Sequence, residues 1–159
     1  MPLRRVAAWS QAARDGSSGR RLAGARDSRG SAEDFPGTGG LGSLGRYLLQ
    51  GLVQERAAVS ARGWAALFPW GTLAVNLSGC FAIGLLAGLF EARWPARPEL
   101  RVFLLVGVLG GFTTFSTFGF ETWSLARGGG LLLAAGNALA SVLLGYLGVA
   151  LGAALARSI

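Results

Sequence analysis

The sequence predicts an all-α integral membrane protein with four transmembrane helices, and three observations support this fold class. Apolar residues make up 52% of the chain and charged residues only 14%, whereas about 25% of the residues in a typical soluble domain are charged. Glycine occurs 26 times, and membrane helices use glycine to bring their backbones close together. Four apolar segments also follow the first 37 residues, without the period-two alternation of barrel strands.

The first segment, residues 39–53, is the least apolar of the four. It carries Arg46 and a glutamine, so by itself it also fits an amphipathic helix lying on the membrane surface. Three glycines spaced three residues apart, Gly39, Gly42 and Gly45, would give it a smooth stripe for packing against another helix. An arginine inside a span is costly unless it faces water or a polar partner, which makes Arg46 a candidate functional residue.

The second segment, residues 70–90, contains no charged residue and would be about 30 Å long as a helix. Pro69 and Trp70 stand at its start, as expected for a helix that begins at a membrane interface. Asn76 lies inside this uncharged span, where an amide is costly unless it is hydrogen-bonded. The sequence leaves open whether Asn76 bridges two helices or is a donor in a pore.

The third segment, residues 101–125, is predicted to be a helix broken from Gly110 to Thr113. Its two adjacent glycines each cost about 1 kcal/mol relative to alanine in a helix. They precede four hydroxyl residues that can bond freed backbone groups, namely Thr113, Thr114, Ser116 and Thr117. The fourth segment, residues 131–155, has no charge and follows a turn of three glycines.

Two interpretations of the break remain open. Non-helical backbone inside a membrane is tolerated only where it is buried in protein or lines an ion site, and exposed carbonyls or helix N-termini there bind ions. The same residues are also typical of a seam between packed helices. Phe112, Phe115 and Phe118 are predicted to share one helix face. They would serve either as core or lipid-facing rings, or as rings whose positive edges meet an anion.

The composition excludes several functions. The chain has no histidine and a single cysteine, Cys80, which excludes the usual transition-metal sites, histidine-based acid–base catalysis and a Ser-His-Asp triad. We therefore expect no enzyme. The net charge of +7 comes from arginines that lie mostly before residue 38 or beside apolar segments. Because they form no basic face, nucleic acid is not an expected partner.

Residues 1–37 are predicted to form a disordered, arginine-rich tail, because they lack apolar periodicity, and residues 38–159 a four-helix transmembrane domain. A targeting segment and a misplaced start of translation are alternatives for the tail. Without the tail, the side of the two termini carries four arginines and the other side three. This near-tie is expected of a protein that inserts in both orientations, whereas the tail would favour an N-terminus inside.

Three motifs resemble the Fluc/CrcB family of fluoride channels. They are GGLGSLGRY at residues 39–47, PWGTLAVNLSG at residues 69–79 and GVLGGFTTFSTFGFE at residues 107–121. The resemblance covers about residues 38–155. It implies a four-helix subunit and an antiparallel, dual-topology dimer with two pores in the cell (plasma) membrane. It also implies passive, selective fluoride export that protects the cytoplasm from fluoride toxicity.

The resemblance assigns roles to residues by their place in the motifs. Phe115 and Phe118 would line the fluoride pore with their ring edges, and Asn76 would be a pore-lining donor. The polar track beside the two rings would be matched by Ser116, Thr117 and Ser141.

Further roles implied by the family lie at the ends and the centre of the pore. Glu121 would sit near a pore mouth, and Arg46 in a polar vestibule. The backbone carbonyls of Gly110 and Thr113, one pair from each subunit, would hold a structural sodium ion (Na+) at the dimer interface.

The sequence departs from the family pattern in two places. Many members carry a tyrosine four residues before the serine matched by Ser141, and here that position is Asn137. Asn137 could still donate a hydrogen bond. The arginine-rich tail is also unusual, and by fixing one orientation it would favour a heterodimer with an oppositely oriented paralogue over a homodimer.

Two other functions fit the composition. A small four-helix multidrug/proton exporter needs a membrane-embedded carboxylate in its first helix, but the first acidic residue here is Glu55, at the end of that helix and just past residues 39–53. A non-transporting membrane scaffold subunit would explain the many glycines. It would not explain a glycine pair joined to a run of hydroxyl residues and phenylalanines.

Overall fold

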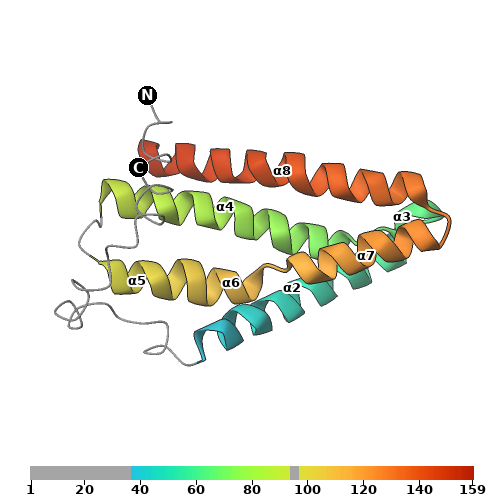
Figure 1. Ribbon diagram of the computed structural model, residues 1–159, viewed down its shortest axis with the longest axis horizontal. Coiled ribbons are helices and arrows are strands. Elements are labelled where there is room, and N and C mark those ends of the chain that lie inside the picture. The colour runs from blue at the N-terminus through green and yellow to red at the C-terminus, as the bar shows by residue number, and fades with distance from the viewer. Residues whose placement is uncertain (1–36, 94–96) are drawn as a thin grey trace, which may run out of the picture. The chain divides into compact units, whose positions relative to one another are not determined.

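The computed structural model describes residues 37–93 and 97–159, and helices make up nearly all of this part of the chain (Figure 1). The predicted tail, apart from Gly37, lies outside the described residues. The three long helices are α2 (Thr38–Ser60), α4 (Trp70–Ala92) and α8 (Leu131–Ser158). The shorter elements are α3 (Trp64–Leu67), α5 (Pro98–Val102), the π-helical stretch η3 (Phe103–Val108), α6 (Leu109–Phe112) and α7 (Phe115–Arg127).

Three stretches are long and apolar enough to cross a membrane, namely α4, Pro98–Arg127 and α8. They correspond to the second, third and fourth predicted segments. Helix α2 has 23 residues, enough for about 35 Å at 1.5 Å per residue, but it is not among these stretches. The first predicted span is therefore present as a helix, and its passage through the membrane stays a prediction.

Helices α4 and α8 form the most extensively packed pair, and they run side by side in Figure 1. Glycines allow their backbones to meet. A Cβ atom at Gly84 would overlap the carbonyl group of Val149, and one at Gly152 would overlap the carbonyl oxygen of Phe81. Apolar burial provides little force between helices in lipid, so this close approach, with its dispersion contacts, is what stabilises the pair.

Helix α2 packs on α6 through a second glycine contact. A Cβ atom at Gly42 would overlap the carbonyl oxygen of Val108, and one at Gly111 would overlap that of Gly39. The hydroxyl group of Ser43 donates a hydrogen bond to the Gly111 carbonyl at 3.3 Å. The glycine stripe predicted on the first segment thus faces a neighbouring helix at Gly42.

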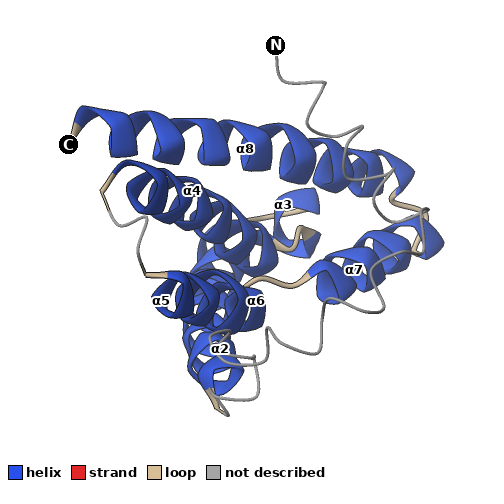
Figure 2. Cartoon of the chain, turned by 60° about the vertical axis from the view of Figure 1, so that its left-hand side comes forward, coloured by secondary structure: helices blue, strands red, loops and turns tan. Residues whose placement is uncertain are grey.

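The third span loses its helical backbone at Thr113 and Thr114, which lie between α6 and α7 (Figure 2). Their φ/ψ angles are −78°/157° and −147°/108°. The sequence placed the break from Gly110 to Thr113, but Gly110 and Gly111 are helical and belong to α6. A glycine lowers helix propensity without forcing a break, and a different interaction fixes the non-helical residues.

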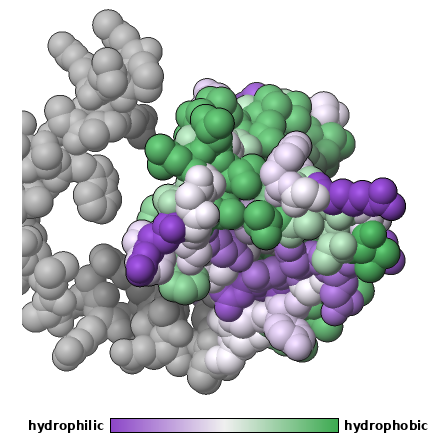
Figure 3. Space-filling view, turned by 90° about the vertical axis from the view of Figure 1, so that its right-hand side faces the viewer, coloured by the Kyte–Doolittle hydropathy of each residue, from purple (hydrophilic) through white to green (hydrophobic). Residues whose placement is uncertain are grey.

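Much of the apolar surface is exposed in the single chain. Leu132 is 89%, Tyr146 78% and Tyr47 76% exposed. Surfaces of this kind are covered by lipid or by another chain in a membrane protein. Figure 3 looks onto the end of the described unit where α7 leads into α8, and there hydrophilic residues gather between apolar ones.

Candidate functional site

The break in the third span is held by a side chain of α4. The amide nitrogen of Asn76 donates to the carbonyl oxygen of Thr114 at 3.2 Å, and the backbone N–H of Thr114 donates to the amide oxygen of Asn76 at 2.9 Å. The side-chain amide thus replaces both helical partners of one residue. Because Thr114 is only 6% exposed, its backbone groups would otherwise be left unpaired away from water, which is costly.

Thr114 in turn begins the next helix. Its hydroxyl oxygen accepts a hydrogen bond from the backbone N–H of Thr117 at 3.2 Å and donates one to the Thr117 hydroxyl at 2.8 Å. This is an N-cap, which satisfies a backbone donor that the first turn of a helix leaves without a partner. The break therefore consists of one side-chain clamp from α4 and one cap for α7.

These two interactions release two carbonyl oxygens. In an unbroken helix the N–H of Thr114 would bond the Gly110 carbonyl, and the N–H of Thr117 would bond the Thr113 carbonyl. Here Asn76 takes the first N–H and the Thr114 hydroxyl takes the second. Gly110 is exposed, and the space beside it is open. Oxygen atoms freed in this way are suitable ligands for a hard cation.

A cavity of about 360 Å³ lies beside the break, between α4, the third span and α8. It brings together six of the ten residues to which the sequence assigned roles, namely Asn76, Gly110, Thr113, Phe115, Phe118 and Ser141. Cys80 and several aliphatic side chains complete the lining. No charged side chain is part of it, so the polar groups here are an amide, hydroxyls and backbone atoms.

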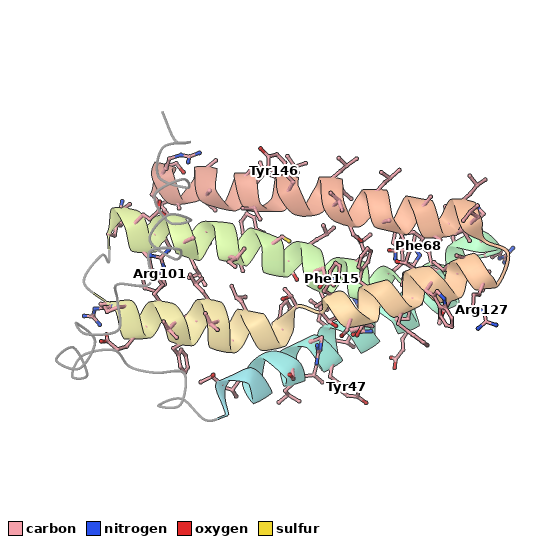
Figure 4. The ribbon with its side chains drawn as sticks, in the orientation of Figure 1. Tyr47, Phe68, Arg101, Phe115, Arg127 and Tyr146 are labelled. Carbon is pink, nitrogen blue, oxygen red and sulfur yellow. The ribbon has the colours of Figure 1, made fainter. Side chains whose placement is uncertain are left out.

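The two phenylalanines of α7 pair at this cavity. Their ring centroids are 5.6 Å apart with an angle of 46° between the ring planes. Phe115 is 84% exposed and lies at the junction of α6 and α7 (Figure 4), whereas Phe118 is half-buried. The edges of such rings carry partial positive charge and their faces partial negative charge.

Phe112 does not join this pair, and the prediction that the three rings share one helix face is wrong. The ring of Phe112 lies against Gly45 of α2 and Gly79 of α4, where a Cβ atom added to each glycine would stand 3.6 and 3.4 Å from the ring. The cause is the break, because Thr113 and Thr114 interrupt the helical rotation between Phe112 and Phe115.

Ser141 of α8 contributes an unusual group to the cavity lining. Its hydroxyl oxygen is buried, yet it has no hydrogen-bond partner among the described residues. An unpaired buried hydroxyl costs about 1–3 kcal/mol. A donor kept in this state at a cavity wall is available to a bound ion or water.

Two predicted residues of the polar track lie elsewhere. Ser116 is exposed and does not line the cavity. The hydroxyl of Thr117 accepts the hydrogen bond from Thr114 and stabilises the start of α7. Arg46 is half-buried on α2 and lines neither this cavity nor the next one described.

Glu121 lies at a second cavity, of about 630 Å³, which α2 and α7 line together with the glycine turn and the start of α8. The Thr72 hydroxyl donates to one carboxylate oxygen of Glu121 at 2.8 Å, and the side-chain amide of Gln50 donates to the Thr72 hydroxyl at 3.2 Å. The other carboxylate oxygen is buried without a partner among the described residues. The chain of contacts joins α2, α4 and α7.

Sequence patterns did not identify the partners of Thr114 or the role of Thr72. Thr114 had a local signal, since threonine is a favoured N-cap residue and Thr114 stands in the hydroxyl run beside the predicted break. Thr72 had none, because its partners Gln50 and Glu121 are far away in the sequence.

Comparison with known proteins identifies the family. A family model described as CrcB-like protein, camphor resistance, matches residues 37–153. The chain belongs to the CrcB-like family. The resemblance inferred from the three motifs is thereby confirmed, and with its apolar helices the chain is a multi-pass membrane protein.

Several curated members of the CrcB-like family are similar over most of their length. A fluoride-specific ion channel FluC from Solibacter usitatus is 50% identical over 119 residues, 75% of this chain and 92% of the relative. One from Rhodospirillum centenum is 45% identical over 121 residues, 76% of this chain and 90% of the relative. One from Agrobacterium fabrum is 46% identical over 121 residues, 76% of this chain and 91% of the relative.

Proposed function

We propose that this CrcB-like protein is a fluoride-selective channel that lets fluoride leave the cytoplasm passively. One observation carries the proposal. The cavity at the break combines two phenylalanine rings, an amide and an unpartnered serine hydroxyl, with no charged side chain in its lining. The names of its relatives, fluoride-specific ion channels, support the choice of ion.

The cavity lining suits a small, strongly hydrated anion. Fluoride leaves water only if hydrogen-bond donors replace its hydration shell, and the Ser141 hydroxyl has no other partner among the described residues. Asn76 has two amide hydrogens, and one of them is committed to Thr114, so the second is available. The edges of Phe115 and Phe118 add positive potential without a formal charge. An uncharged lining of this kind binds the ion without trapping it.

The polar groups outside the cavity take part at its entrances in this proposal. Glu121, Thr72 and Gln50 would border one pore mouth, and Arg46 would lie in a polar vestibule. Ser116 and Thr117 stay assigned to the polar track, with Thr117 also stabilising the start of α7 through its hydrogen bond to Thr114.

The freed carbonyls of Gly110 and Thr113 fit a structural sodium ion. Hard cations take several oxygen ligands, and one chain offers two carbonyls here, so a second copy would complete the coordination. When bound, such an ion would neutralise the carbonyl dipoles of the break and join two subunits. The residues of this chain keep the carbonyls free for such an ion, because Asn76 and the Thr114 hydroxyl occupy the N–H groups that would otherwise bond them.

The proposed assembly is an antiparallel dimer of four-helix subunits with two pores in the plasma membrane. Helix α2 would be the fourth span, with its polar residues turned toward the pore or the partner. The near-equal arginine counts of the two sides support insertion in both orientations. A homodimer follows if the chain inserts both ways, and a heterodimer with a paralogue if residues 1–37 fix one orientation.

Growth on fluoride tests this function. Bacteria that lack their own fluoride exporter should grow in fluoride when they express this chain, and Phe115→Ile or Phe118→Ile should remove most of that protection. The matched control is Phe81→Ile, since Phe81 lies on α4 and lines neither cavity described above. Equal protection by the Phe118→Ile and wild-type proteins at equal expression would contradict a role for the ring edge. Absence of any protection by the wild type would contradict fluoride export.

A further inference from the structure

Asn137 of α8 is the most deeply buried polar side chain in the part of the chain that the structure describes, at 1% exposure. Its amide nitrogen donates to the hydroxyl oxygen of Thr122 on α7 at 2.8 Å. The Thr122 hydroxyl donates to the carbonyl oxygen of Phe118 at 2.7 Å. Burying an amide is costly unless its hydrogen bonds compensate. An apolar side chain would pack between α7 and α8 without that cost, so the role of the Asn137–Thr122 hydrogen bond has to lie in something other than packing.

The Asn137–Thr122 hydrogen bond lies in a helical hairpin with a short turn. Helices α7 and α8 are joined by Gly128–Gly130, where Gly129 has a φ of 84° and the N–H of Gly130 donates to the Leu125 carbonyl at 2.9 Å. A connection this short makes the two helices antiparallel neighbours, as Figure 1 shows. Residues at equal distances from such a turn face each other.

Two pairs of residues are symmetric about the Gly129–Gly130 peptide bond. Thr122 and Asn137 form the first pair and share the hydrogen bond. Phe118 and Ser141 form the second pair, one helical turn further from the glycines. Independently of this symmetry, Phe118 and Ser141 line the same cavity. The hydrogen bond of the first pair thus lies one helical turn from the pair that lines the cavity.

The rest of the hairpin gives little information about register. Apart from Asn137 and Ser141, α8 carries only apolar and glycine residues from Leu131 to Gly145, and contacts between such surfaces can slide. A shift of one turn along α8 would place Gly145, which has no side chain, or Asn137 opposite Phe118, and the hydroxyl donor would be lost. A single buried asparagine is known to fix the register of packed helices in this way.

We propose that Asn137 is a positioning residue that sets the register of α7 on α8 and so holds the Ser141 hydroxyl opposite the Phe118 ring. Asn137 itself does not touch the ion. The consequence for fluoride rests on the proposed function, whereas the register does not. The two are therefore tested separately.

Cross-linking tests the register without any transport. Phe118→Cys and Ser141→Cys are introduced together in a Cys80→Ala background, and their cross-linking by a short bis-methanethiosulfonate reagent, from which each cysteine thiolate displaces a sulfinate, is timed in membranes. Asn137→Leu, which is close in size and lacks the donor, should slow the reaction about tenfold, since loss of a positioning contact displaces the pair. Thr122→Ser keeps the hydroxyl and should react at the original rate. Equal rates with and without the Asn137→Leu substitution, or no cross-link at all, would overturn the proposal.

Single-channel fluoride current in planar bilayers tests the consequence, because it reports each channel and not the folded fraction. Asn137→Leu and Thr122→Val should each reduce the current about threefold to tenfold, and the double variant should lose no more than either alone. In a Ser141→Ala background, Asn137→Leu should cause no further loss, since the group it positions is gone.

Two results would show that Asn137 only stabilises the fold. In the first, the current of the Asn137→Leu/Thr122→Val double variant falls by the product of the two single losses. In the second, Asn137→Leu reduces the current as much in the Ser141→Ala background as in the wild type. Ser78→Ala is the control, because Ser78 is exposed and bonds only its own helix. If the wild-type protein carries no fluoride current, the proposed function fails, and the cross-linking rates alone decide the register.

Discussion

Replacing Asn76 by alanine should weaken the fold at the break more than any comparable change on α4. The substitution removes two hydrogen bonds, of 3.2 and 2.9 Å, from the backbone of Thr114. An unpaired buried donor or acceptor costs about 1–3 kcal/mol, and Thr114 is 6% exposed. Polar contacts between membrane helices are worth less on average, about 0.6 kcal/mol. Weighing both, we expect Asn76→Ala to lower the free energy of unfolding by about 2–4 kcal/mol.

Thermal unfolding in detergent, followed by tryptophan fluorescence, measures this loss. A change of about 3 kcal/mol corresponds to a fall of about 10 °C in the midpoint for a chain of this size. The unfolding midpoint of Asn76→Asp should be lowered by as much at pH 8, since a second carboxylate oxygen would face the Thr114 carbonyl in place of the amide donor. The control Ser78→Ala removes a hydroxyl that bonds only within α4 and should change the midpoint by about 1–2 °C. An unfolding midpoint of Asn76→Ala equal to that of the control would refute the conclusion that the Asn76 amide stabilises the break.

Two further predictions concern packing and the second polar cluster. Gly152→Ala should lower the unfolding midpoint by about 5 °C, because its Cβ would overlap the Phe81 carbonyl. The control Gly136→Ala has open space beside it and should leave the midpoint equal or higher. Equal falls in both variants would contradict the close α4–α8 contact. Thr72→Val should cost about 1–3 kcal/mol in the same assay, since it leaves a Glu121 oxygen and the Gln50 amide without their partner. A Thr72→Val protein as stable as Thr72→Ser would contradict that linkage.

The spans could be predicted from the sequence because an uncharged stretch of about twenty residues is a local property. Segments 70–90 and 131–155 correspond closely to α4 and α8. The position of the break could be predicted only approximately. Glycine propensity pointed to Gly110, whereas the structure unwinds at Thr113 and Thr114. The deciding group, the Asn76 amide, lies 38 residues away in sequence from Thr114, and no local pattern reveals such a pairing.

The candidate site shows the same division between local and distant effects. The resemblance to a family assigned Phe115, Phe118 and Ser141 to one pore. These three residues line one cavity, and their role in a pore stays a prediction. Periodicity failed for Phe112, because a helical period has meaning only within one unbroken helix. Asn137 looked like an isolated departure from the family pattern. Its role depends on its hydrogen bond to Thr122, which only the packed hairpin reveals.

The most direct test of the proposed function is fluoride efflux from liposomes that contain the purified protein alone, read with a fluoride electrode. We expect rapid fluoride efflux with no leak of chloride, which would establish a selective channel that needs no other chain. Equal release of both ions would contradict selectivity by the cavity at the break. If well-folded wild-type protein releases no fluoride, the chain is not a channel that works without a partner. The fold would still stand in that case, provided that the Asn76 and Gly152 variants unfold as predicted.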